Sequence, residues 1–348
     1  MRLHLGHHFY GAGNLGDDFM LAGFLRALRQ RHPDVQLTAN IPFQLGPVQA
    51  RTPEIEWQPY ELARRQENIR ACDAWVGLGG SPFQSAQSRW FIDHLIADAE
   101  ICRAAGKPMY FLGVGVQSGQ ELDVPDVRKL CAQAAAIWTR DAASADRLRG
   151  LPEMAHVAAA ADLAHLYFEQ TRPPLPQPGR LTLVPNFDYG TWAGRDACLR
   201  AVDQLEPATR VWLAQESREL PGAEKALYAA LPARERAPWQ LVSPDREGAP
   251  LAEVLSGWPS GEWLITSRFH AAIAGAWAGS KVVVIGINEK LRGIARELAA
   301  PLIEPDADAS TVLHALASAQ PALPPLALAQ QAWQSCEAFA RSAVAHAR

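Results

Sequence analysis

The sequence predicts an α/β fold with two domains, each a parallel sheet covered by helices. The chain has 348 residues, and one domain usually takes about 150. Short apolar runs alternate with amphipathic stretches in both halves, a pattern typical of parallel strands joined by helices. Between the halves, Thr171–Gly179 contains four prolines and a glycine and cannot continue either element, so it is the expected linker.

The first half contains two clear helical patterns. Five apolar residues recur at three- and four-residue spacing along Asp17–Arg31 and make one apolar face. They are Met20, Leu21, Phe24, Leu25 and Leu28. Arg89–Ala105 is also predicted helical, with Trp90, Leu95 and Ile101 on its apolar side and Gly106-Lys107-Pro108 as its stop. The expected strands are Leu3–Phe9, Val35–Ile41, Ala71–Leu78, Met109–Val116, Ala136–Arg140 and His156–Ala159.

The same alternation restarts after the linker. The expected strands are Leu181–Pro185, Val211–Ala214, Gln240–Val242, Trp263–Thr266 and Lys281–Ile287, and the expected helices are Arg195–Gln204, Gly222–Ala230, Ala252–Gly257, His270–Ala278 and Glu289–Leu298. A last helix, Leu326–His346, is expected to cross back to the first domain. The predicted organisation is therefore a domain over 1–170, the linker 171–179, a domain over 180–322 and a C-terminal part, 323–348.

Composition excludes several classes of protein. Hydrophobic residues make up 48% and charged residues 20% of the chain, which is ordinary globular usage. The net charge of -4 argues against a protein whose main partner is nucleic acid. We find no apolar run of transmembrane length and no signal peptide pattern at the start. Five scattered cysteines fit a reducing cytoplasm and argue against disulfides and a zinc site.

Ligands of open parallel sheets bind at the carboxyl ends of the strands, near helix N-termini. The segment Gly11–Asp18 lies at such a place, after the first strand. Its glycine spacing matches a dinucleotide motif, but the acidic pair Asp17-Asp18 would repel a pyrophosphate, and no Gly-Lys-Ser/Thr follows for a phosphate loop. Two interpretations stay open: an ordinary turn with an acid at the helix start, or an acceptor loop in which Asn14 and an aspartate hold sugar hydroxyls.

Three further segments follow predicted strands, and each is weak alone. Gly79-Gly80 is either a tight turn or a ligand loop. Gly113 and Gly115 alternate along a strand and would allow close approach of backbone or ligand. Arg140 could present its planar fork to a carboxylate or phosphate, or could simply form a surface pair with Asp141.

The strongest candidate is Thr266-Ser267-Arg268-Phe269-His270, at the end of an apolar strand and the start of a helix of small residues. One fixed cation and one group that titrates near neutrality suit a phosphorylated substrate that must be protonated. One strand later, Lys290 follows Gly286-Ile287-Asn288-Glu289. It is either a ligand of the same site or a solvated lysine at a helix start.

Taken in order, these motifs resemble the polysaccharide pyruvyl transferase family from about residue 7 to residue 295. The resemblance implies two Rossmann-like domains facing across a cleft, as in the glycosyltransferase B architecture. It also implies transfer of the enolpyruvyl unit of phosphoenolpyruvate to a sugar of a cell-surface polysaccharide or its lipid-linked precursor. The products are a pyruvate ketal and phosphate.

The resemblance assigns roles to residues of this chain. Arg140, Arg268 and Lys290 would bind the donor, and His270 would be the general acid, so these side chains are expected to line one hollow. The acceptor side would include Asn14, Asp17, Asp18 and Gly80. The middle glycine motif has two glycines where three are usual, and no aromatic residue precedes Lys290. Both differences concern the acceptor site.

The expected partners are phosphoenolpyruvate and a glycan, without a metal, a cofactor or nucleic acid. The expected location is the cytoplasm, at the inner face of the membrane if the acceptor is lipid-linked. An alternative function is a nucleotide-sugar glycosyltransferase of the same architecture, with Glu304 as the acid that binds the ribose. A binding protein that has lost catalysis is the third class.

Overall fold

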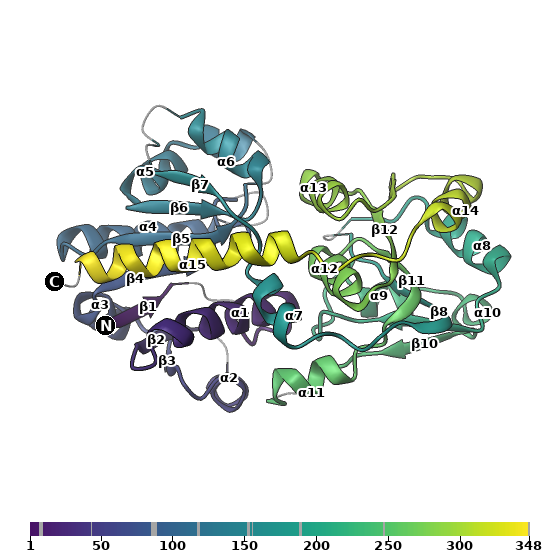
Figure 1. The fold of residues 1–348 in the computed structure, drawn as a ribbon, viewed down its shortest axis with the longest axis horizontal. Coiled ribbons are helices and arrows are strands. Elements are labelled where there is room, and N and C mark those ends of the chain that lie inside the picture. Colours follow the sequence, from purple (N-terminus) through teal and green to yellow (C-terminus); the bar gives the residue numbers. More distant parts are fainter. Residues whose placement is uncertain are drawn as a thin grey trace. The chain divides into compact units, whose positions relative to one another are not determined.

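A parallel sheet of seven strands forms the core of the first structural unit in the computed structural model (Figure 1). The structure describes residues 1–6, 10–42, 44–84, 89–116, 119–151, 154, 156–187, 190–245 and 248–346. The strand order is β3-β2-β1-β4-β5-β6-β7, the order of a Rossmann sheet with one added edge strand. The strands are β1 (Arg2–Leu5), β2 (Gln36–Ile41), β3 (Glu56–Pro59), β4 (Ala74–Leu78), β5 (Met109–Val114), β6 (Ala136–Thr139) and β7 (Val157–Ala159).

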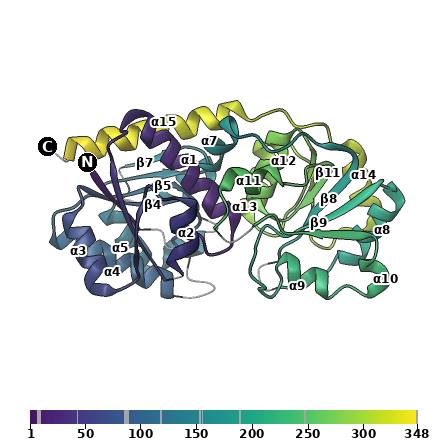
Figure 2. The same cartoon turned by 90° about the horizontal axis from the view of Figure 1, so that it is seen from below.

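Helices cover both faces of this sheet. Figure 2 shows α1 and α15 on one face and α3, α4 and α5 on the other. Phe339 of α15 packs against Phe24 of α1 and Tyr110 of β5. The helices are α1 (Leu15–Arg31), α2 (Leu45–Arg51), α3 (Leu62–Ala71), α4 (Trp90–Ala104), α5 (Pro125–Gln133), α6 (Ala142–Arg149), α7 (Ala164–Gln170) and α15 (Leu326–His346), with a 3₁₀ turn at Gly119–Asp123.

The second unit repeats the Rossmann order with six parallel strands, β10-β9-β8-β11-β12-β13. These are β8 (Gln177–Val184), β9 (Thr209–Leu213), β10 (Trp239–Val242), β11 (Gly261–Thr266), β12 (Lys281–Ile285) and β13 (Leu302–Ile303). The helices are α8 (Arg195–Leu205), α9 (Glu224–Ala229), α10 (Ala233–Arg236), α11 (Leu251–Ser256), α12 (Phe269–Ala278), α13 (Glu289–Glu297) and α14 (Ala309–Ser318). All ten residues of α12 are buried, because its small side chains let neighbouring elements pack on every side.

Contacts between residues divide the chain into two units. The first consists of Met1–Ala12, Asp17–Tyr167 and Leu326–Arg348, and the second of Gly13–Gly16 and Phe168–Pro325. The glycine-rich turn before α1 is therefore shared, because its middle residues group with the second unit. The strand β8 begins at Gln177, so the last three residues of the expected linker already belong to a sheet.

The strongly periodic segments have the structure that the sequence predicts. The five apolar residues of Asp17–Arg31 are all buried, and Leu326–His346 is one helix. The predicted strand Leu3–Phe9 ends at Leu5, and residues 7–9 lie outside the described residues. The predicted place of Trp90 on an apolar face is wrong, since Trp90 is 40% exposed at the first turn of α4.

Candidate functional site

The Ser-Arg-x-His motif lies where β11 ends and α12 begins, at the carboxyl edge of the second sheet. The hydroxyl of Thr266 donates to Val184 O (3.1 Å) and accepts from Arg268 N (2.8 Å). The hydroxyl of Ser267 accepts from Asn186 N (2.6 Å) and donates to Asn186 O (2.7 Å). The two hydroxyls tie the turn to the end of β8, so they fix the backbone that carries the next side chains.

The guanidinium of Arg268 is held by a buried carboxylate. Its Nε donates to Glu224 Oε1 (2.7 Å) and its Nη2 to Glu224 Oε2 (3.1 Å). The Glu224 side chain is fully buried, and its backbone oxygen accepts from Trp212 Nε1 (2.8 Å). Such a bidentate pair sets the plane of the guanidinium. Removing either partner would leave a buried charge without compensation.

His270 lies one residue into α12, against the backbone of the glycine-rich turn. The residue is 7% exposed, and its ring lies edge to face with Phe269, with centroids 5.3 Å apart. A Cβ atom at Gly16 would lie 2.1 Å from His270 Nδ1. Only glycine at this position therefore lets the turn approach the imidazole so closely. The Nδ1 edge of the ring faces this turn.

Lys290 reaches the same place from the next helix. Asn288 caps α13 by accepting from Leu291 N (3.1 Å), which places Lys290 in the first turn. The Lys290 Nζ lies 5.6 Å from the centroid of the Phe269 ring. Lys290 is therefore not a fully solvated lysine at a helix start. It is half-buried, and its ammonium group lies over the ring of Phe269, the residue between Arg268 and His270.

Asn14 is held by the second unit through both backbone and side chain. Its Oδ1 accepts from Gly16 N (3.2 Å) as a helix cap and from Gln215 Nε2 (3.2 Å). Ser217 N donates to Gly13 O (2.7 Å), and Asn14 pairs with Glu216 in an isolated β-bridge. The predicted acceptor residue Asn14 thus lies in the same unit as Arg268, His270 and Lys290.

Arg140 lies in the first unit, directly after β6, and is only 3% exposed. Its Nη1 donates to Gly80 O (3.2 Å) and its Nη2 to Ser81 Oγ (3.1 Å). A Cβ atom at Gly115 would lie 2.3 Å from Arg140 Nη2, so the alternating glycines make room for the guanidinium. The pair with Asp141 is present, with Arg140 Nε 3.6 Å from Asp141 Oδ2, but it lies at a buried guanidinium and not on the surface. Arg140 thus joins three of the predicted motifs.

Of the acidic pair Asp17-Asp18, Asp18 makes contacts that stabilise the first unit. Asp18 accepts from Gly11 N (2.8 Å) and forms a buried ion pair with Arg51. Asp17 is half-buried in the first turn of α1. Burial, and then the charges of Asp17 and Asp18, raise the pKa of Tyr10 well above its ordinary value. The acceptor roles of both aspartates and of Gly80 stay predictions.

The structure therefore brings Asn14, Arg268, His270 and Lys290 together in the second unit. It places Asp17, Asp18, Gly80 and Arg140 in the first unit. That all the predicted donor residues line one hollow stays a prediction. Sequence reasoning missed Glu224, which has no local signal because it lies 44 residues before Arg268. It also missed Gln215 and Glu216, although both follow a predicted strand.

The acid proposed for ribose binding has another partner. Glu304 accepts from Arg292 through both carboxylate oxygens, at 2.5 and 2.6 Å. These bonds hold the pKa of Glu304 below its ordinary value. The side chain of Glu304 is 52% exposed and its carboxylate has further lone pairs, so a ribose hydroxyl would share this carboxylate with Arg292.

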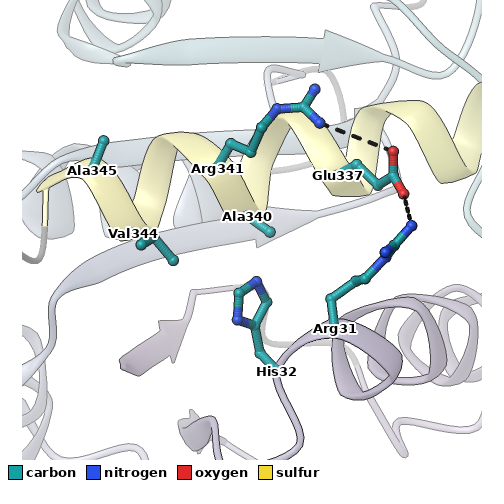
Figure 3. A pocket seen from close by; sticks show the side chains of 7 residues that line it. All are labelled: Arg31, His32, Glu337, Ala340, Arg341, Val344 and Ala345. Atoms are coloured by element: carbon teal, nitrogen blue, oxygen red, sulfur yellow. Dashed lines mark hydrogen bonds and ion pairs between the residues drawn. The ribbon is translucent and has the colours of Figure 1, made fainter.

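A cavity of about 560 Å³ lies in the first unit, between the end of α1 and α15 (Figure 3). Arg31 (2.6 Å) and Arg341 (4.0 Å) both pair with Glu337 beside it. Its described lining contains none of the predicted site residues.

No group of three or more His, Cys, Asp or Glu side chains in the described chain could hold a metal ion. Among the described helices, none combines the length and hydropathy that crossing a bilayer requires.

Comparison with solved structures identifies the fold. Anabaena Alr3699/HepE in complex with UDP is similar with a TM-score of 0.62 and 11% identity over 99% of both chains. The UDP-GlcNAc 2-epimerase of Methanocaldococcus jannaschii has a TM-score of 0.62 and 10% identity, covering 98% of this chain and 100% of the other. Phytolacca americana UGT2 has a TM-score of 0.54 and 10% identity, covering 100% and 99%. The predicted α/β, glycosyltransferase B-like fold is confirmed.

Comparison of sequences identifies the family. No curated protein matches the chain significantly. The model of the family described as polysaccharide pyruvyl transferase matches residues 14–289. The matched segment begins at Asn14 and ends at Glu289, and it contains Arg140, Arg268 and His270. The chain therefore belongs to the polysaccharide pyruvyl transferase family and is a transferase.

Proposed function

We propose that this transferase moves the enolpyruvyl unit of phosphoenolpyruvate onto a sugar of a cell-surface polysaccharide or its lipid-linked precursor. The observation that supports this most is the cluster of Arg268, His270 and Lys290 at two adjacent helix N-termini. The donor carries about three negative charges near neutral pH, and guanidinium, ammonium and helix N-termini all favour anions. In this proposal, Glu224 keeps the guanidinium of Arg268 oriented while the donor is bound.

The reaction requires a proton donor next to the bound anion. His270 would protonate the methylene carbon of the donor, so that positive charge develops on the adjacent carbon. One sugar hydroxyl attacks that carbon and gives up its proton, and a second hydroxyl then replaces the phosphate to close the ketal. One proton thus ends on the new methyl group and one leaves with the phosphate. Because Nδ1 faces Gly16, we assign the proton transfer to Nε2.

The first unit would supply the acceptor side. For Arg140 we keep donor binding as a proposal, and its bonds to Gly80 and Ser81 add a second role in shaping that turn. The scheme uses no metal or cofactor. The five cysteines are buried free thiols, which supports a reducing cytoplasm as the place of reaction. A lipid-linked acceptor would bring the protein to the inner face of the membrane.

The test is release of phosphate from phosphoenolpyruvate in the presence of a panel of glycan acceptors. We expect His270→Ala to keep donor binding and to lose turnover by about 10²–10⁴-fold, the usual contribution of a general acid. Arg268→Ala should lose donor binding, whereas Arg140→Lys should raise the KM for phosphoenolpyruvate. Equal loss of binding in the His270 and Arg268 variants would give His270 a holding role. No phosphate release with any acceptor would contradict the proposal.

A further inference from the structure

An aromatic cluster with one exposed and two half-buried members lies at the carboxyl edge of the first sheet. Tyr60 follows the last residue of β3, and Trp90 opens α4 with His94 one turn later. The ring centroids are 6.1 Å apart for Tyr60 and Trp90, 4.8 Å for Tyr60 and His94, and 4.4 Å for Trp90 and His94. We call these three residues the aromatic platform. Trp90 is 40% exposed, whereas Tyr60 and His94 are half-buried.

Two buried charged residues, Arg65 and Asp98, hold Tyr60 of the aromatic platform in place. The guanidinium of Arg65 lies 4.8 Å from the centroid of the Tyr60 ring and donates to the Tyr60 hydroxyl. Arg65 Nε is 2.9 Å from Asp98 Oδ1, and both side chains are buried. Asp98 also accepts from Trp75 Nε1 (3.1 Å). These contacts hold Tyr60, and Tyr60 and His94 in turn pack against Trp90, so the exposed Trp90 ring loses little entropy when a ligand stacks on it.

The charges around the aromatic platform are balanced. Arg89 bonds to Asp93 (3.0 Å) and Asp126 (2.8 Å), and Arg64 bonds to Glu67 (3.3 Å). An anionic membrane surface is recognised by an excess of basic residues beside apolar ones, which these pairs do not provide. Rigid aromatic faces with polar edges suit instead the C–H face and the hydroxyls of a neutral sugar ring.

We propose that the aromatic platform binds a sugar ring of the acceptor glycan at a distance from the sugar that is modified. The proposal rests on the proposed function for the acceptor class. The turn with Gly80 follows β4, and three strand spacings separate β4 from β3. The strands that precede Gly80 and Tyr60 are therefore about 14 Å apart, which is more than the width of one pyranose ring. The preferred acceptor is therefore an oligosaccharide or longer glycan, and a monosaccharide cannot reach both places.

The test measures glycan binding by the full chain without phosphoenolpyruvate, on an array of neutral oligosaccharides of graded length. We expect the wild type to bind the longer glycans. Trp90→Ala should lower this affinity about tenfold or more, the scale of removing an aromatic anchor. Trp90→Phe should retain most of it. Leu323→Ala is the matched control, since Leu323 is 85% exposed in the second unit. In turnover, Trp90→Ala should raise the KM for long acceptors and leave kcat and the KM of short acceptors unchanged.

The outcomes separate the two proposals. Wild-type affinity in a Trp90→Ala variant with an unchanged melting temperature would overturn the aromatic platform, as would a wild type that binds no glycan on the array. If the wild type binds anionic vesicles but no glycan, and Trp90→Ala abolishes the vesicle binding, the ligand of the aromatic platform is a membrane surface and not a sugar. Glycan binding that depends on Trp90 in a protein that releases no phosphate from phosphoenolpyruvate would leave the aromatic platform intact and refute the pyruvyl transfer.

Discussion

Arg268 is oriented by Glu224, a residue that lies 44 positions earlier in the chain. Sequence motifs identified the arginine, because a strand end before a helix of small residues is a local pattern. They could not identify the buried carboxylate, because its position depends on how β9 and β11 pair with β8. Gly115 is a similar case. The alternation of Gly113 and Gly115 is visible in the sequence, but glycine is needed at 115 because the fold places the guanidinium of Arg140 there.

Gly16 offers a direct test of how closely the glycine-rich turn meets His270. A methyl group in Gly16→Ala would lie 2.1 Å from Nδ1 and must displace the imidazole. We expect turnover to fall by roughly tenfold or more, because small displacements of catalytic groups are costly, while the protein still folds. The control is Gly46→Ala, since nothing lies within 4 Å of a Cβ atom there. Unchanged turnover in Gly16→Ala would remove His270 from the reacting centre.

His4 predicts how stability depends on pH. Its imidazole is fully buried in β1, with Nδ1 3.1 Å from Thr38 Oγ1. Burial, and then the charges of Arg65 and Arg2, lower its pKa from 6.5 to about 3. Between pH 6.5 and about pH 3, His4 therefore carries a proton in the unfolded chain but not in the folded chain. Within this window the free energy of unfolding falls as the pH falls, by about 1.4 kcal/mol per pH unit.

His4→Leu should remove this one-proton dependence. Unfolding measured between pH 7 and pH 4.5 should give a shallower slope for the variant than for the wild type. Equal slopes would mean that His4 is charged in the folded protein. Only the difference in slope is diagnostic, because the substitution also changes packing.

Among the elements, the sequence did not predict α5 and α14, although their buried residues are apolar, and it also missed two elements of the first sheet and its cover, α3 and β3. The helix α3 was not expected, because Arg65 and Asn68 are buried together with a single isoleucine, Ile69. The edge strand β3 was missed because Trp57 is the one buried residue among its four. Both elements support the aromatic platform, so buried polar contacts there prepare a surface that hydrophobic patterns do not show.

The tight packing of α12 can be tested with two glycines. A Cβ atom at Gly275 would lie 2.3 Å from Leu264 Cδ2. Gly275→Ala should therefore destabilise the protein by about 1–3 kcal/mol, the usual cost of overpacking. Gly293→Ala in α13 meets nothing within 4 Å and should stabilise by about 0.4–1 kcal/mol, since alanine restricts the unfolded chain. Chemical denaturation measures both. Destabilisation of equal size in the two variants would contradict the account of α12.

At the scale of the whole molecule, alternation of strands and helices was enough to predict two parallel sheets, and the strand orders agree with it. The same fold occurs in proteins solved with UDP or UDP-sugars, at 10–12% identity. Fold therefore does not decide the donor. The decision rests on the charged groups at the start of α12 and α13, where Arg268 and Lys290 suit a small, highly anionic molecule.

The central claim is that the second unit binds phosphoenolpyruvate through Arg268. The most direct measurement is the melting temperature of the wild type and of Arg268→Ala with phosphoenolpyruvate, UDP-glucose or UDP-GlcNAc at equal concentrations. We predict that phosphoenolpyruvate alone stabilises the wild type and that Arg268→Ala loses this stabilisation. Stabilisation by a UDP-sugar and none by phosphoenolpyruvate would contradict the account and favour a nucleotide-sugar glycosyltransferase.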